Sequence, residues 1–144
     1  MRSRRTVTHA RADPSRPLVI LVDDDTALRT ALKFSLELDG FAVEAFETAE
    51  EVLSQPVLAE VSCLVMDQNL PGLSGVEALH QLRQKGMRTP ALLITSNPGP
   101  TLRKAAAATD AAIVEKPLLG DVLVGSIIGV LSPEATRALS APNR

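Results

Sequence analysis

The stretch "CLVMDQNLPGLSG" (Cys63–Gly75) joins a short apolar run to an aspartate and then to a turn. The four apolar residues Cys63 to Met66 are typical of a strand buried on both faces of a parallel sheet. Asp67 ends this run, and Pro71 and Gly72 then turn the chain. A carboxylate at the end of a buried strand is costly unless another group compensates its charge. The surroundings of Asp67 are therefore central to what this chain does.

Four other short apolar runs are also typical of strands. These runs are Leu18–Val22, Phe41–Phe46, Pro90–Ser96 and Ala111–Val114. The segments between and after them have the spacing and the terminal residues of helices, which we expect at residues 26–40, 48–55, 74–86, 101–108 and 118–131. Strands that alternate with helices favour a parallel sheet covered on both faces. We therefore expect an α/β fold with a doubly wound, five-stranded parallel sheet.

Local capping patterns mark the ends of several predicted helices. Glu51 follows Thr48 by three residues, which is the pattern of a capping box. Asp25 or Thr26 is expected to cap the first helix, and Gly40 stands where that helix would end.

The composition is that of an ordinary globular chain with one domain. Of its 144 residues, 45% are hydrophobic and 22% are charged, while aromatic residues make up 2%, so stacking on nucleic acid bases has little to work with. No apolar stretch is long enough to span a membrane, and no secretory signal follows the first arginines. The single cysteine, Cys63, is interpreted as a small buried side chain in a cytoplasmic protein.

The charge is unevenly distributed along the chain. Residues 1–16 hold five arginines and one aspartate, so they carry +4 of a net charge of −2 and leave −6 for the rest. We interpret residues 1–16 as a basic, flexible tail, although such a tail could also contact nucleic acid or an acidic partner. The folded domain is expected over residues 17–132, followed by a polar tail over residues 133–144.

Polar side chains stand where the predicted strands end. Asp23 and Asp24 follow the first strand, Asp67 follows the third, Thr95 closes the fourth, and Lys116 follows the fifth after one residue. In an open parallel sheet these ends meet at one edge, where ligands bind. Three neighbouring carboxylates repel one another and favour a hard divalent cation such as Mg²⁺. Together with a hydroxyl and an amine, they are suited to an attack on phosphorus by a carboxylate.

Each of these residues has a simpler explanation when taken alone. A run such as "DDD" (Asp23–Asp25) is more often a cluster at a helix start than a metal site. Lys116 before Pro117 means nothing by itself. The agreement of five residues at four strand ends is what favours the phosphorus chemistry.

These motifs resemble the receiver domain of two-component response regulators. The matching motifs are "VDDD" with Arg29 downstream, "MDQNLPGLSG", "LLITS" and "EKP", in the order and with the separations of that family, and they cover about Leu18–Leu131. The resemblance implies a flavodoxin-like fold with strand order 2-1-3-4-5. It also implies a signalling protein that accepts a phosphoryl group, rather than an enzyme, of the stand-alone type.

The resemblance implies a Mg²⁺ site at this edge. Asp24 would bind the ion directly and Asp23 largely through water. Asp67 and the backbone carbonyl of Asn69 would be the further protein ligands.

The resemblance also makes Asp67 the phosphoacceptor. The phosphoryl group would come from a phosphohistidine on a sensor histidine kinase or on a histidine phosphotransfer protein. Lys116 would contact the phosphoryl group, Thr95 would be the switch hydroxyl, and the bond between Lys116 and Pro117 would be cis. Mg²⁺ and Lys116 would neutralise the charge that develops during transfer. The phosphorylated chain could also dephosphorylate itself.

One position departs from the family pattern. An aromatic switch residue usually lies three positions before the lysine, and here that residue is Ile113. Either Ile113 packs in a single buried state and leaves the signal to the backbone after Thr95, or phosphorylation changes this surface only weakly. The segment "NPGP" (Asn97–Pro100) would stiffen the same loop, which fits a smaller motion.

Two other functions stay open at this point. A small Mg²⁺-dependent phosphatase would also use Asp67 as its nucleophile, but Gln68 and Asn69 replace the Asp-x-Asp motif, and the chain shows no inserted cap. A degenerate receiver would act only as a scaffold. The complete set of acids with Thr95 and Lys116 argues against that reading.

The expected output is partner binding or onward phosphotransfer, because too few residues follow the last helix for a DNA-binding module. On that helix, Val122 and Ile128 lie toward the flanks, and Gly125 and Gly129 lie four apart on the outer face. A glycine inside a helix costs about 1 kcal/mol relative to alanine. These residues predict a homodimer or a partner contact through this helix and the helix at 101–108, with mere sequence slack as the alternative.

Overall fold

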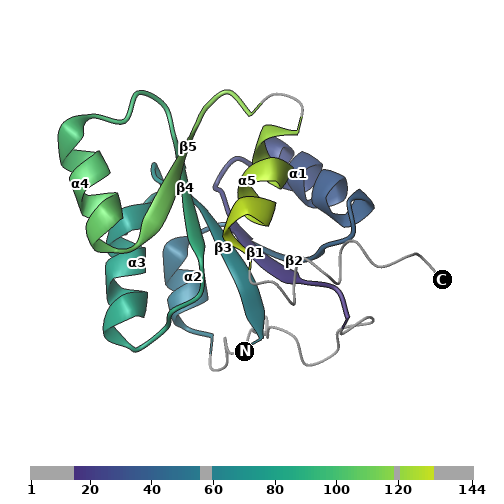
Figure 1. Cartoon of the computed structure of the whole chain (residues 1–144), viewed down its shortest axis with the longest axis horizontal. Coiled ribbons are helices and arrows are strands. Elements are labelled where there is room, and N and C mark those ends of the chain that lie inside the picture. Colours follow the sequence, from purple (N-terminus) through teal and green to yellow (C-terminus); the bar gives the residue numbers. More distant parts are fainter. Residues whose placement is uncertain (1–14, 56–59, 119–120, 132–144) are drawn as a thin grey trace.

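The computed structural model describes residues 15–55, 60–118 and 121–131, and over that part of the chain five strands alternate with five helices (Figure 1). The strands are β1 (Leu18–Val22), β2 (Ala42–Phe46), β3 (Val61–Asp67), β4 (Ala91–Thr95) and β5 (Ala111–Glu115). The helices are α1 (Thr26–Leu38), α2 (Ala49–Leu53), α3 (Gly75–Gln84), α4 (Pro100–Ala108) and α5 (Val122–Val130). Neighbouring strands are parallel, in the order β2-β1-β3-β4-β5. The predicted fold class and strand order are confirmed.

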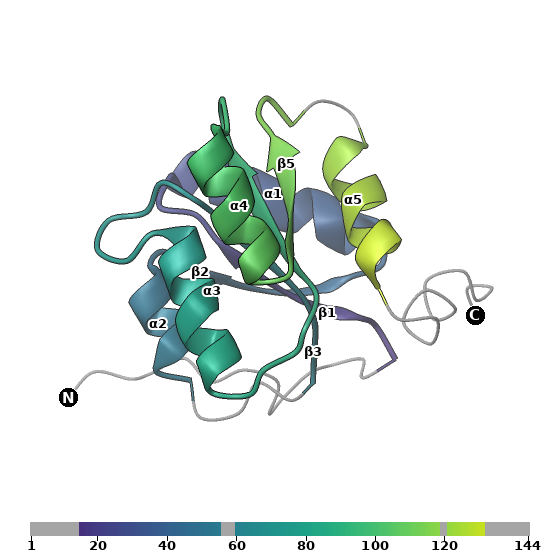
Figure 2. The same cartoon turned by 60° about the vertical axis from the view of Figure 1, so that its left-hand side comes forward.

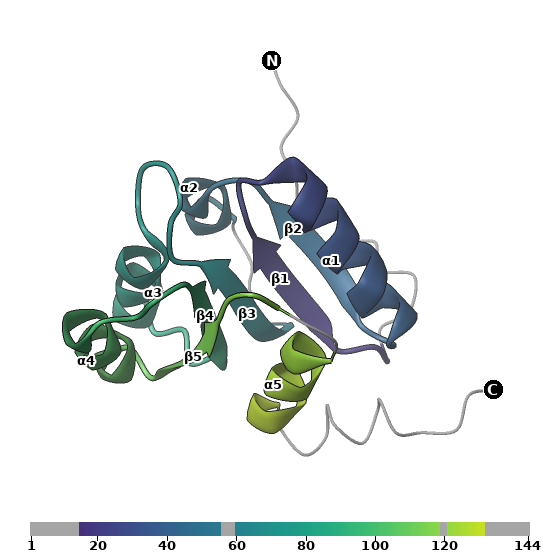
Figure 3. The ribbon, with the colours of Figure 1, turned by 90° about the horizontal axis from the view of Figure 1, so that it is seen from above.

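The sheet lies between two layers of helices, with α1 and α5 on one face and α2, α3 and α4 on the other (Figures 1 and 3). Figure 2 shows α4 beside α3 on the second of these faces, and α4 also contacts β5. Successive side chains of a strand point to opposite faces. Ile20 therefore packs with the cluster under α2, α3 and α4, and its neighbour Leu21 packs with the cluster under α1 and α5.

The inner strands β1 and β3 are largely apolar because both of their faces are covered. All five residues of β1 are buried, and so are Cys63–Asp67 of β3. This burial explains the continuous apolar runs from which the strands were predicted. It also fixes the ends of β1 and β3 rigidly, and those ends carry Asp23 and Asp67.

The predicted helix caps are present. The Asp25 side chain accepts the backbone N–H of Leu28 at the start of α1. Thr48 and Glu51 form the predicted capping box of α2. Past the end of α1, Gly40 has a φ of 102°, a left-handed conformation that glycine adopts without strain.

Some element boundaries differ from the prediction. The strand predicted at Cys63–Met66 extends to Asp67, because Asp67 pairs with Ile94 of β4 and so belongs to the ladder. The last helix begins at Val122 rather than Leu118, since Asp121 occupies its N-cap position. Most of the two predicted tails, residues 1–16 and 133–144, lies outside the described residues. None of the described helices combines the length and the apolar character needed to cross a bilayer.

Candidate functional site

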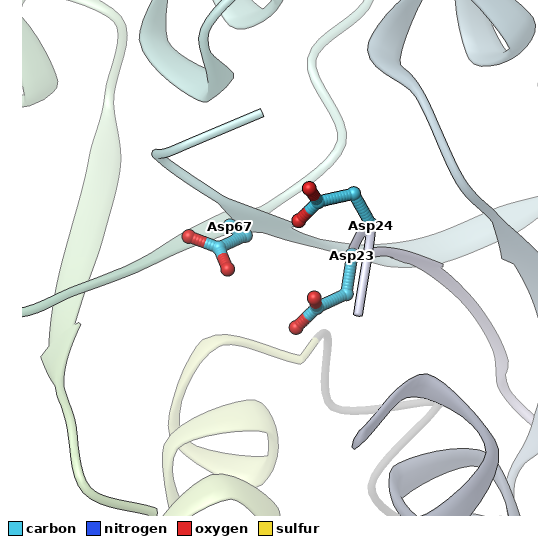
Figure 4. A group of neighbouring side chains, drawn as sticks. All are labelled: Asp23, Asp24 and Asp67. Atoms are coloured by element: carbon cyan, nitrogen blue, oxygen red, sulfur yellow. The ribbon is translucent and has the colours of Figure 1, made fainter. Parts of the chain in front are cut away.

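The carboxyl ends of β1, β3 and β5 bring the predicted site residues together. Asp23 and Asp24 directly follow β1, and Asp67 is the last residue of β3. Each of these three acids offers a carboxylate oxygen, and the three oxygens lie within 4.8 Å of one another. Figure 4 shows the three carboxylates as neighbours. The Nζ of Lys116, just after β5, lies 2.9 Å from Oδ2 of Asp67.

Asp67 is nearly inaccessible, with 3% of its surface exposed, and both of its carboxylate oxygens have partners. Oδ1 accepts the backbone N–H of Asn69 at 3.0 Å, and Oδ2 accepts a hydrogen bond from Lys116 at 2.9 Å. These two partners come from different segments, the loop after β3 and the residue after β5. The ammonium of Lys116 supplies the counter-charge that an acid at the end of a buried strand requires.

Asp23 is a buried acid with other charged groups close to it. Its side chain is 2% exposed and accepts the backbone N–H of Asp25 at 2.9 Å. Burial raises the pKa of Asp23, and the charges of Asp67 and Asp24 raise it further, while the bond from Asp25 and the charge of Lys116 act in the opposite direction. The fold therefore holds Asp23 in a place where its ionised form is unfavourable.

Arg29 supports the first strand end from α1. Its Nη1 donates to the backbone carbonyl of Asp23 at 2.6 Å, and its Nη2 lies 3.5 Å from the hydroxyl of Thr26. The sequence named Arg29 only as a companion of the acidic motif. No sequence pattern predicts its hydrogen bond to the carbonyl of Asp23.

The residues present fit a divalent metal ion of the hard type. Asp23, Asp24 and Asp67 bring three carboxylates to the site, whereas Lys116 brings one ammonium, so negative charge is in excess. Mg²⁺ prefers oxygen ligands of this kind and needs only a few from the protein. The Asn69 carbonyl stays a predicted ligand, and the bond from Asn69 N to Asp67 ties its residue to the site.

Thr95 lies at the same edge but is engaged elsewhere. It ends β4, is 3% exposed, and its hydroxyl donates to the carbonyl of Ser96 at 3.2 Å. Its own carbonyl accepts the backbone N–H of Lys116 at 2.9 Å. Thr95 is thus joined to the lysine through the backbone rather than through its side chain.

Gln68 and Gly75 hold α3 close to the end of β3, and neither was assigned a role from the sequence. Gln68 Oε1 accepts the backbone N–H of Val76 at 2.8 Å, in the first turn of α3. A Cβ at Gly75 would lie 2.7 Å from the Asp67 carbonyl oxygen and 2.7 Å from the Leu93 side chain. Only glycine leaves room for this approach. The glycine in "LSG" was visible in the sequence, but its neighbour across the fold was not.

Ile113 lies in β5, at the position where the family usually has an aromatic residue. Ile113 is half-buried and packs against the core cluster that includes Ala106 of α4. The peptide bond between Lys116 and Pro117 is cis, as predicted.

The comparisons with known proteins agree with this geometry. Residues 19–128 match the response regulator receiver domain. The transcriptional regulatory protein FixJ of Azorhizobium caulinodans is 31% identical over 118 residues, which are 81% of this chain and 56% of FixJ. The FixJ of Bradyrhizobium diazoefficiens is 32% identical over 110 residues, 76% of this chain and 54% of that protein. This chain spans about half the length of the curated relatives it matches.

Solved structures show the same fold. The chemotaxis protein CheY4 of Vibrio cholerae has a TM-score of 0.75 and 25% identity, covering 81% of this chain and 99% of that chain. The response regulator protein TrrA of Thermotoga maritima, solved in complex with Mg²⁺-BeF, has a TM-score of 0.69 and 26% identity, covering 80% and 99%. With the family match extending over most of its length, the chain belongs to the response regulator receiver domain family of two-component signalling proteins.

Proposed function

We propose that the chain accepts a phosphoryl group on Asp67 from a phosphohistidine, carried by a sensor histidine kinase or a histidine phosphotransfer protein, in a Mg²⁺-dependent reaction. The observation that carries this proposal is the placement of the Asp67 carboxylate. It lies within 4.8 Å of the Asp23 and Asp24 carboxylates and 2.9 Å from the Lys116 ammonium.

In the proposed transfer, a carboxylate oxygen of Asp67 attacks the phosphorus, and the bond from phosphorus to the donor's imidazole nitrogen breaks. The imidazole leaves with the electron pair of that bond. Lys116 balances charge on the transferred phosphoryl oxygens, which it can reach because it already contacts Asp67. The rigid end of β3 holds the nucleophile in place, so that positioning and electrostatics supply most of the catalysis.

Asp23, Asp24, Asp67 and the Asn69 carbonyl would hold Mg²⁺, which supplies positive charge next to the phosphoryl oxygens and relieves the repulsion among the acids. The excess of carboxylates supports this assignment. The similar protein TrrA, solved with Mg²⁺-BeF, supports it independently.

The test is incubation with acetyl phosphate and Mg²⁺, followed by intact mass measurement. We expect one phosphoryl adduct on the wild-type chain. The Asp67→Asn variant should show none, and chelation of Mg²⁺ should suppress the adduct on the wild type. A folded wild-type chain that forms no adduct would support a scaffold function instead, and an adduct that persists in Asp67→Asn would place the phosphoacceptor elsewhere.

We further propose that Thr95 is the switch hydroxyl and that output runs through partner contact at α5. Val122 and Ile128 are 44% and 40% exposed, and both belong to α5. A Cβ added at Gly125 or Gly129 would meet no atom within 4 Å, so both glycines face open space. Replacing Ile128 with Glu and measuring mass by light scattering tests the homodimer version. If the wild type is a monomer at high concentration, only the contact with a different partner remains. If the wild type is a dimer and Ile128→Glu does not change its mass, the proposed contact through α5 is wrong.

A further inference from the structure

An acid from α2 holds the loop between β3 and α3, which comprises residues 68–74 and carries Asn69. The backbone N–H of Leu73 donates to Oε2 of Glu50 at 2.9 Å, a contact between residues 23 positions apart. In Figure 3 this loop rises beside α2. The contact links the site to a helix that supplies none of the predicted site residues.

The residue before Leu73 makes room for this contact. Gly72 has a φ of 75°, which side chains other than that of glycine rarely adopt. A Cβ at this position would also collide with Oε2 of Glu50. A side chain at position 72 would therefore displace the carboxylate as well as strain the backbone.

The other bonds of the loop lie near its two ends. Gln68 N donates to the Ile94 carbonyl at 2.9 Å, and Asn69 N donates to Asp67 Oδ1 at 3.0 Å. At the far end, Ser74 N donates to the Glu77 side chain at 2.9 Å. Leu73 directly precedes that far end, so Glu50 adds a bond from outside the loop just before the chain enters α3.

We propose that Glu50 is a positioning residue for the metal site. It holds the loop in the conformation that presents the Asn69 carbonyl beside Asp67, and so raises the affinity for a divalent cation. This inference rests on the proposed function, in which that cation is Mg²⁺. Glu50 acts through the loop, and a partner that displaced it by binding α2 would weaken the metal site without touching Asp67.

The test compares Glu50→Ala and Glu50→Gln with the wild type. In the metal-free protein, hydrogen exchange followed by NMR should show the Leu73 amide exchanging roughly fivefold faster in Glu50→Ala, as expected for the loss of one hydrogen bond. Calorimetric titration with Mg²⁺ should show a Kd raised about tenfold, the lower end of the effect of removing a group that orients a metal ligand. Glu50→Gln keeps an acceptor oxygen, so its Leu73 exchange rate and its Kd for Mg²⁺ should lie between those of the wild type and of Glu50→Ala.

Two further variants separate positioning from a general loss of stability. Gly72→Ala should weaken Mg²⁺ binding through the same contact, so the double variant Glu50→Ala/Gly72→Ala should be little worse than either single one. Arg83→Gln lowers stability at the opposite edge of the sheet and should leave the Kd for Mg²⁺ unchanged.

An unchanged Kd in Glu50→Ala would overturn the inference, as would an equal rise in Arg83→Gln. An unchanged exchange rate of the Leu73 amide would overturn it as well. A wild-type chain that binds no Mg²⁺ would instead refute the metal step of the proposed function. The two failures are therefore distinguishable.

Discussion

Replacing Asp23 with Asn should stabilise the metal-free protein, although it removes a predicted metal ligand. Asp23 is buried, and its carboxylate lies within 4.8 Å of those of Asp24 and Asp67. The asparagine oxygen can still accept the backbone N–H of Asp25, which is the hydrogen bond that Asp23 makes in the fold. The substitution therefore removes like-charge repulsion and the cost of burying a charge while keeping the local structure.

The size of the effect follows from the distances. Two like charges about 4.8 Å apart repel by roughly 3–4 kcal/mol at an effective dielectric constant of about 20. The attraction of Lys116 and the water that reaches exposed Asp24 offset more than half of this. We expect the free energy of unfolding to rise by about 1–2 kcal/mol, which corresponds to a gain of roughly 3–8 °C in Tm for a domain of this size.

The pH dependence has a definite sign. Because the fold raises the pKa of Asp23 above 3.8, protonated Asp23 favours the folded state, and that contribution is lost as pH rises from about 3.8 through the folded value. The wild type should therefore be the less stable chain at pH 7. Its difference from Asp23→Asn should shrink as pH falls toward 4.

The assay is urea unfolding at pH 7 in EDTA, followed by circular dichroism because the chain has no Trp or Tyr for fluorescence. Mg²⁺ should stabilise the wild type more than Asp23→Asn, because the variant has one carboxylate fewer at the site. The matched control is Asp121→Asn, which removes an exposed acid whose side chain makes no cap bond. A less stable Asp23→Asn in EDTA, or equal stabilisation of both chains by Mg²⁺, would refute the electrostatic reasoning.

Three further predictions test the core and its edges. Burial raises the pKa of Cys63 from 9.0 to about 12, so a thiol reagent at pH 8 should label it only after unfolding, and labelling of the native chain within minutes would contradict this. The stability that comes from the protonated thiol should be lost as pH rises from about 9 to about 12. The guanidinium of Arg83 donates to four backbone carbonyls in the turns after α3 and α4. Arg83→Gln should therefore lower the free energy of unfolding in urea by about 2–3 kcal/mol, and a decrease below about 0.5 kcal/mol would show that water replaces these bonds. Gly75→Ala should cost about 1–3 kcal/mol and slow phosphorylation by acetyl phosphate, because the added methyl group collides with the Asp67 carbonyl; a stable variant with normal phosphorylation would contradict the crowding.

Much of the fold was predictable because its signals are local. Buried strands such as Leu18–Val22 are continuous apolar runs, since helices cover both of their faces. Capping residues such as Asp25 and Thr48 mark helix starts through bonds to residues only three positions away. Boundaries were less certain where pairing decides them, and Asp67 joined β3 because of its partner Ile94 in another strand.

That these candidate residues lie close together was also predictable, because parallel strands bring their carboxyl ends to one edge of the sheet. From the sequence alone, Asp23, Asp24, Asp67 and Lys116 could be assigned to that edge. Their mutual distances could not, because they depend on the twist of the sheet and on how each loop packs. The bond from Lys116 to Asp67 joins residues 49 positions apart, and no local pattern specifies it.

The tertiary structure alone decided how the loop after Asp67 is held. Glu50 reads in the sequence as an ordinary acid in the first turn of α2, where it favours the helix dipole. Its contact with Leu73 depends on α2 packing beside α3, and on a glycine at position 72 that leaves space for the carboxylate. The sequence by itself determined which side chains lie at the carboxyl ends of the strands, because strand ends and helix caps are short-range features. Only packing between distant segments decided how these side chains and the loop after Asp67 are positioned.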